Sequence, residues 1–140
     1  MDNWVKRRAS QERTVASSAP VFWSAVYSAL RDACDAYREH YGTDVELIPE
    51  NGSRVLIVKT AAAGYVKARV TVVFNADRLE IEVARAEDTL TFQVAADETS
   101  AFALERPDGP KLSPDDVSRK ILEPVLFPPR GPAAQLYRKD

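Results

Sequence analysis

Apolar residues follow a helical period over residues 19–41. When successive residues are placed 100° apart around a helix, the polar positions share one sector, and the apolar positions fill the remaining arc of about 200°. A helix on a protein surface needs an apolar stripe of only about 100°. The sequence therefore predicts one long helix that is covered on more than one side. Ser17 and Ser18 are its expected N-cap residues, and Gly42 is its expected end.

Beyond Gly42 the apolar period changes to two, which is typical of β-strands. Turn-forming residues separate successive segments, and Asn51-Gly52 predicts a tight hairpin turn because both residues accept a positive φ. A sheet built as a meander is expected, with one apolar face and one polar face. The predicted strands cover residues 44–48, 54–60, 65–74, 79–83, 90–94 and 102–104.

The register of two hairpins can be predicted from the requirement that apolar residues meet. A slip of one residue would turn each apolar row toward water. The turns are expected at residues 76–77 and 86–87, and the second of these brings Arg85 opposite Asp88. The register of the first hairpin stays open, because residues 54–60 are apolar on both faces. The predicted pairs are Phe74–Leu79, Val72–Ile81 and Val70–Val83, followed by Val83–Leu90, Ile81–Phe92 and Leu79–Val94.

A second helix is predicted to start at Ser113, with Pro114 in its first position and Asp115 and Asp116 in its first turn. Pro124 is expected to kink or end it. The resulting fold class is α+β with two layers: a long N-terminal helix, a five- or six-stranded antiparallel meander, and a C-terminal helix on the same face. The predicted organisation is a basic arm, flexible or short-helical, over residues 1–18, one domain over residues 19–126, and a proline-rich extended tail over residues 127–140.

Composition excludes several classes of function. The chain has 140 residues, 45% hydrophobic and 29% charged, with a net charge of −2, so no global positive field draws it to nucleic acid or to an anionic membrane. No segment approaches the 18 or so apolar residues that span a bilayer. The single cysteine cannot form an internal disulfide. We therefore expect a bacterial-type cytoplasmic protein without a signal peptide.

Residues 28–42 hold a thiol, an imidazole and several carboxylates, which together suggest a nucleophilic active site. Cys34 and His40 are six residues apart, however, and side chains on one helix face each other only at spacings of three or four. Both residues are better explained as structural parts of the helix. With one cysteine and one histidine, the chain also lacks a zinc ligand set.

Other catalytic and cofactor motifs are weak. The five glycines cannot form a dinucleotide or phosphate loop, so we expect no cofactor. Glu80 and Glu82 share a strand face, roughly 7 Å apart, but on the predicted solvated face their pKa values would stay ordinary. The inventory leans away from an enzyme, and we predict no catalytic or metal-binding residues.

The simplest explanation for the breadth of the apolar arc is that the sheet, the C-terminal helix and the tail of the same chain cover it. The same breadth also leads to two functional hypotheses. The first is a protein-interaction module that binds a partner or a second copy of itself, because aromatic side chains often anchor interfaces. Its expected interface is Trp23, Tyr27, Leu30, Cys34 and Tyr41. The second is a small-molecule binding protein or enzyme with a cavity between helix and sheet. Its expected lining is Tyr37, Phe74, Phe92 and Phe102.

The basic N-terminal segment suggests a third function, weak contact with nucleic acid. Trp4 lies next to a run of cations, and aromatic and basic residues together are typical of single-strand binding. The segment is short and the rest of the chain is acidic, so this alternative is weaker than protein contact.

Overall fold

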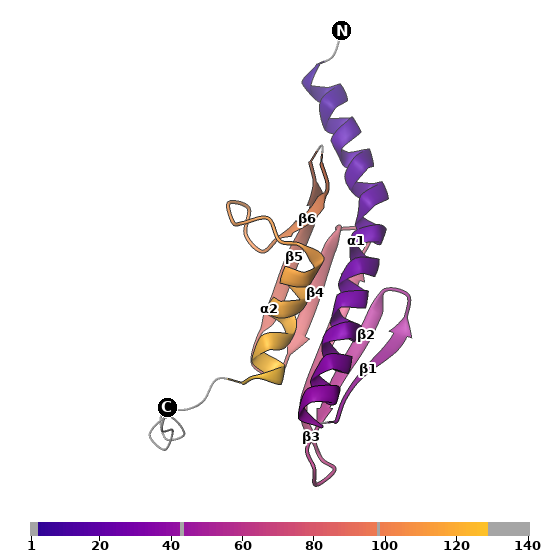
Figure 1. Cartoon of the computed structure of the whole chain (residues 1–140). Helices are drawn as coiled ribbons and strands as arrows, with labels where there is room; N and C mark the ends of the chain where they lie inside the picture. The colour runs from indigo at the N-terminus through magenta and orange to yellow at the C-terminus, as the bar shows by residue number, and fades with distance from the viewer. Residues whose placement is uncertain (1–2, 43, 98, 129–140) are drawn as a thin grey trace.

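The molecule is a two-layer α+β fold, as the sequence predicts. The structure is a computed structural model that describes residues 3–42, 44–97 and 99–128. In that part of the chain, two helices lie side by side on one face of a six-stranded antiparallel sheet (Figure 1). The strands follow in chain order, each paired with the next. The elements are α1 (Trp4–Tyr41), β1 (Asp44–Asn51), β2 (Arg54–Thr60), β3 (Val66–Asn75), β4 (Glu80–Arg85), β5 (Thr89–Ala96), β6 (Ala101–Leu104) and α2 (Pro114–Leu126).

The core lies between the sheet and the two helices. Residues that pair directly across strands point to the same face, so the pairs Val72↔Val83 and Ile81↔Phe92 build continuous apolar rows. Phe92 is completely buried. Burying such a side chain stabilises the fold by about 1.5–3 kcal/mol. From α1 the core receives Ala19, Phe22, Trp23, Val26, Leu30 and Cys34, and from α2 it receives Val117, Ile121, Leu122 and Leu126.

The start of α1 differs from the prediction, because the helix begins at Trp4 and not at residue 19. Asn3 is the N-cap, and its side chain accepts a hydrogen bond from the amide of Lys6. Residues 4–18 contain no glycine or proline and many good helix formers. Pro20 sits inside the helix on its exposed side, where water can bond the carbonyl that the proline leaves without a donor.

The part of α1 over residues 4–18 is here called the helical arm, and its first turns extend beyond the end of the β5–β6 hairpin (Figure 1). At 1.5 Å per residue this arm is about 22 Å long. Side chains from Asn3 to Thr14 are exposed, and Ala19 is the first buried residue along the helix. The arm therefore contributes little to the core.

The predicted register of the β4–β5 hairpin is confirmed, whereas the predicted register of the β3–β4 hairpin is wrong by two residues. Val83 pairs with Leu90, and Arg85 donates two hydrogen bonds of 2.7 Å to the Asp88 carboxylate. Phe74 pairs with Ile81, however, and not with Leu79. The Asn75 side chain accepts hydrogen bonds from the amides of the next loop residues, and Leu79 adopts a φ of 55°, which lengthens the loop. A shift of two residues keeps every side chain on its face.

The first hairpin turns at Gly52-Ser53, one residue later than predicted. Asn51 remains paired with Arg54, and its side chain accepts a hydrogen bond from the Ser53 amide. Gly52 does not adopt a positive φ. The turn therefore does not depend on the tolerance of Asn51 and Gly52 for positive φ, on which the sequence prediction rested. The open register is settled by the pair Leu47↔Ile57.

Both edge strands of the sheet are irregular. In β1 the register shifts between Pro49 and Asn51, and Pro49 has no amide proton to donate. Strand β6 spans only Ala101–Leu104, and Ala103 exchanges backbone hydrogen bonds of 2.9 and 2.8 Å with Leu112. Leu112 thus covers part of the β6 edge.

The start of α2 is as predicted, whereas its end is held by cations from the sheet. Ser113 and Asp116 form a capping box with Pro114 in the first turn. No basic residue lies in the last turn. Lys59, from the buried face of β2, donates hydrogen bonds of 3.3 and 3.2 Å to the carbonyls of Val125 and Leu126. These contacts place positive charge at the negative end of the helix dipole.

Arg85 holds the middle of α2 in the same way. Its Nη1 donates hydrogen bonds of 3.0 Å to the carbonyls of Lys120 and Ile121. The remaining guanidinium donors hold Asp88, and these hydrogen bonds lower the pKa of that carboxyl group. Lys59 and Arg85 therefore attach α2 to the sheet through polar contacts in addition to apolar packing.

We expect Lys59→Met to lower the free energy of unfolding by about 1–3 kcal/mol, because two carbonyls of α2 lose their donor. The matched control is Lys67→Met on β3, where the side chain is exposed and the change should stay within about 0.5 kcal/mol. Urea denaturation of the three proteins measures both effects. A Lys59→Met protein as stable as the parent would contradict this, because the cost of burying the charge would then cancel the gain from its hydrogen bonds.

Candidate functional site

Three of the five predicted interface residues belong to the core of the single chain. Leu30 and Cys34 are 0% and 1% exposed. Trp23 is buried as well, stacks on Phe74 with ring centroids 5.9 Å apart, and donates a hydrogen bond of 2.9 Å to the Gly52 carbonyl. The sheet of the same chain therefore covers the flank of α1 that holds Cys34.

The other two predicted interface residues remain at the surface. Tyr27 is half-buried and meets Trp23 edge to face. Tyr41 is 59% exposed and stacks on Tyr37 at the end of α1, where both rings meet Phe127. This aromatic cluster ties the ends of α1 and α2 together, since Tyr37 also donates a hydrogen bond of 3.0 Å to the Leu126 carbonyl.

The four predicted pocket residues do not come together. Phe74 and Phe92 pack in the core. Tyr37 lies 14 residues beyond Trp23 on α1, roughly 21 Å along the helix from the position of Phe74. Phe102 pairs with Ala95 on the opposite face of the sheet, under the ammonium group of Lys111 at 4.8 Å. The four side chains therefore lie in different parts of the molecule.

The thiol of Cys34 is not activated for catalysis. Burial raises its pKa to about 11, an effect that Arg38 opposes only partly. A nucleophilic cysteine needs the opposite shift, toward the thiolate. His40 lies on an exposed part of α1 beside the ring of Tyr41. The two residues therefore do not form a catalytic pair.

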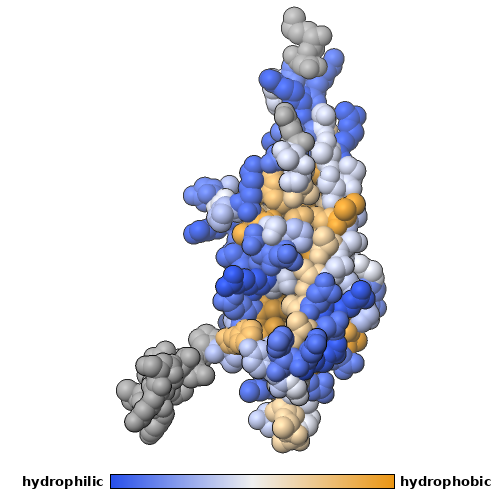
Figure 2. All heavy atoms as spheres, in the orientation of Figure 1, coloured by the Kyte–Doolittle hydropathy of each residue, from blue (hydrophilic) through white to orange (hydrophobic). Residues whose placement is uncertain are grey.

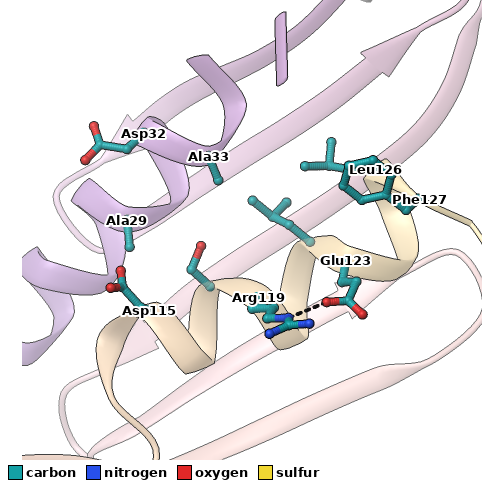
Figure 3. Close-up of a pocket in the computed structure, with 10 residues that line it drawn as sticks. Ala29, Asp32, Ala33, Asp115, Arg119, Glu123, Leu126 and Phe127 are labelled. Atoms are coloured by element: carbon teal, nitrogen blue, oxygen red, sulfur yellow. Dashed lines mark hydrogen bonds and ion pairs between the residues drawn. The ribbon is translucent and has the colours of Figure 1, made fainter. Parts of the chain in front are cut away.

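A groove of about 800 Å³ runs between α1 and α2 (Figure 3). Its alanines, Ala29 and Ala33, face α2 and leave the space that larger side chains would fill. Apolar side chains of α2 and of Phe127, which follows it, complete the floor. The residues of this floor are Ala29, Ala33, Leu122, Leu126 and Phe127. Apolar side chains follow this seam and the adjoining face of α1, with hydrophilic residues on both sides (Figure 2).

The rim of the interhelix groove is acidic. Asp32 of α1 and Asp115 and Glu123 of α2 line it, against one cation, Arg119. Arg119 is already paired with Glu123 at 2.5 Å (Figure 3). Asp32 and Asp115 are exposed. The groove thus offers an apolar floor with two carboxylates at its edge that a cationic partner can reach.

The helical arm has the opposite charge. Its sequence from Asn3 to Ser18 contains four cations and one acid. Two of the cations, Lys6 and Arg7, lie in or next to the first turn, which has no acidic residue. Positive charge at a helix N-terminus opposes the helix dipole and costs about 0.3–1 kcal/mol for each group. The stability of the arm itself therefore does not explain these charges.

The arm and the groove are joined by one face of α1. Residues at spacings of three and four share a side of a helix, and such a series runs from the first turn to the groove rim. None of its members is buried, and Val21 in its middle is 71% exposed. This series, here called the docking face, consists of Trp4, Arg7, Gln11, Thr14, Ser18, Val21, Ala25, Ala29 and Asp32.

Sequence reasoning missed the groove, although a signal for it was present. Ala29, Ala33 and Tyr37 follow one another at intervals of four in the middle of the apolar arc, beside the flank that holds the predicted interface. Small residues at that spacing allow a neighbouring helix to approach or leave a furrow. Whether the helices approach closely or leave a furrow depends on the side chains of α2 that face α1. The sequence does not show which side chains of α2 these are.

Two kinds of feature are absent from the described residues. Among them, no helix combines the length and hydropathy that a membrane span requires. Within the same ranges, no three histidine, cysteine or carboxylate side chains lie close enough together to hold a metal ion.

Comparisons with protein-family models, with curated proteins and with solved structures find no significant match. The function is therefore inferred from the residues of the chain itself.

Cys34 should be almost inert toward thiol reagents in the native protein. At pH 8 the raised pKa keeps it protonated and the core excludes the reagent, so we expect labelling at least a hundredfold slower than in urea. Equal labelling rates in native and unfolded protein would contradict the placement of Cys34 in the core.

The raised pKa of Cys34 also predicts how stability changes with pH. Because the native pKa lies above the unfolded value, the contribution of the Cys34 thiol to the free energy of unfolding is complete below about pH 9 and decreases as the pH rises toward 11.

Proposed function

We propose that this chain is a non-enzymatic protein-interaction module that binds through the docking face of α1 and the adjoining groove. The observation that carries the proposal is the helical arm, whose first turns extend past the β5–β6 hairpin (Figure 1), with Trp4 73% exposed. A helix of about 15 residues without tertiary contacts is only marginally stable in water. A partner that packs against the arm supplies the missing contacts.

The chemistry of the groove also favours protein contact. An apolar floor with a charged rim is the usual anatomy of a protein interface. The groove lies open along two helices and holds no histidine or cysteine among its lining residues. An amphipathic helix laid into such a groove is a common mode of recognition. The single buried cysteine is compatible with the cytoplasm as the site of this activity.

The acidic rim argues against the alternative of nucleic-acid contact through the arm. The docking face carries Arg7 at one end and Asp32 at the other, so a phosphate backbone following it would meet repulsion at Asp32. A protein partner can present both signs of charge in register with the face.

Deleting residues 1–14 should separate binding from folding. The shortened helix would still start at residues that can cap it, Ser17 and Ser18, and the deleted side chains from Asn3 to Thr14 are exposed. We therefore expect the free energy of unfolding to change by less than about 1 kcal/mol. Proteins that the full chain captures from its source organism should be lost from the truncated chain, as identified by mass spectrometry.

The matched control is Thr91→Lys on β5, which alters the opposite face of the sheet and leaves the docking face intact. It should capture the same proteins as the parent chain. Full capture by the truncated chain, or loss of capture with the Thr91 variant alone, would locate the binding surface elsewhere and reject the proposal.

A further inference from the structure

We propose that the partner is a second copy of this chain, and that the arm of each copy fills the groove of the other with Trp4 as its anchor. This inference rests on the proposed function and names the occupant of the groove. Two observations carry it: the opposite charges of the arm and the groove rim, and their position on one face of a single helix.

The positions of the arm and the groove suit a symmetric dimer. Trp4 and Asp32 stand at the two ends of the docking face, and Ser18 lies midway between them. A two-fold axis that crosses α1 at Ser18 sets two copies of the helix antiparallel. Trp4 of each copy then lies over the groove of the other, beside Asp32. Each contact occurs twice, as a closed two-fold interface requires.

A chain cannot fill its own groove with its arm. Trp4 and Ala29 belong to the same unbroken helix, α1. At 1.5 Å per residue they are roughly 38 Å apart along its axis. The arm can therefore reach a groove only in another molecule.

The charges match in this arrangement. Long side chains on a helix lean toward its N-terminus, so Arg7 of one copy points toward Asp32 and Asp115 of the other. Arg7, one of the two cations that oppose the helix dipole of the arm, thereby gains carboxylate partners. The groove rim, in which three acids stand against one cation, gains the positive charge that it lacks.

The apolar parts match as well. The indole of Trp4 is 73% exposed, and the ring of Phe127 on the groove floor is 52% exposed. A groove of about 800 Å³ has room for an indole ring. Tryptophan is among the residues that most often dominate the energy of an interface. Docking of the arm removes both exposed rings from water.

Sedimentation equilibrium over a wide range of protein concentration tests the inference. The parent chain should form dimers, and Trp4→Ala should weaken dimerisation at least a hundredfold, since the anchor is lost from both contacts. The matched control is Val5→Ala, because Val5 is also exposed but lies on another side of α1. It should dimerise like the parent chain.

Charge reversal gives a sharper test. Arg7→Glu on the arm and Asp32→Arg on the groove rim should each weaken dimerisation at least tenfold, because both contacts then oppose like charges. In an equimolar mixture, each of the two contacts again joins opposite charges. The mixture should therefore form a heterodimer with nearly the parent affinity. Arg13→Glu, on a different side of the arm, is the control and should have little effect.

The possible outcomes separate this inference from the proposed function. A parent chain that is monomeric at all concentrations, but still needs Trp4 to capture another protein, overturns the dimer and leaves the interaction module in place. A chain that is monomeric and captures nothing overturns both. Dimers that withstand Trp4→Ala but are lost when residues 129–140 are deleted would assign the groove to the C-terminal segment, and this also overturns the inference.

Discussion

Two cations on the buried face of the sheet determine where the second helix lies. Lys59 and Arg85 donate hydrogen bonds to backbone carbonyls of α2. Such bonds are directional, whereas apolar packing alone would allow the helix to slide. With α2 held in this position, the carbonyl of Leu126 at its end accepts a hydrogen bond from Tyr37, and its apolar side chains line the groove beside α1. These bonds place α2, and the small side chains of Ala29 and Ala33 leave the space of the interhelix groove.

The large features of the fold could be predicted because each depends on local pattern. The period of apolar residues identifies helices and strands, and the capping box of α2 is visible in four consecutive residues. The β4–β5 register was predictable because its turn is short and an ion pair, Arg85–Asp88, spans it. The β3–β4 register was not, because the side chain of Asn75 organises a longer loop that apolar pairing cannot reveal.

The candidate site was harder to predict than the fold, for a physical reason. The breadth of the apolar arc on α1 correctly indicates cover on several sides, but it does not say which element covers which flank. Trp23 and Cys34 were expected at an interface and lie under the sheet, because the β1–β2 hairpin returns alongside α1 and its turn accepts the indole hydrogen bond. Sites between elements depend on distant segments, whereas a sequence pattern describes one segment at a time.

The irregular edges of the sheet have a consequence for how molecules of this chain can associate. An open sheet whose end strands are regular can add further strands without limit and grow into fibres. Here β1 carries a proline and a register shift, and β6 is short and partly covered by Leu112. These features hinder the pairing of further strands with either edge of the sheet. A two-fold contact between side chains of α1, as proposed above, would close at two copies, because such an interface uses the same surface on both molecules.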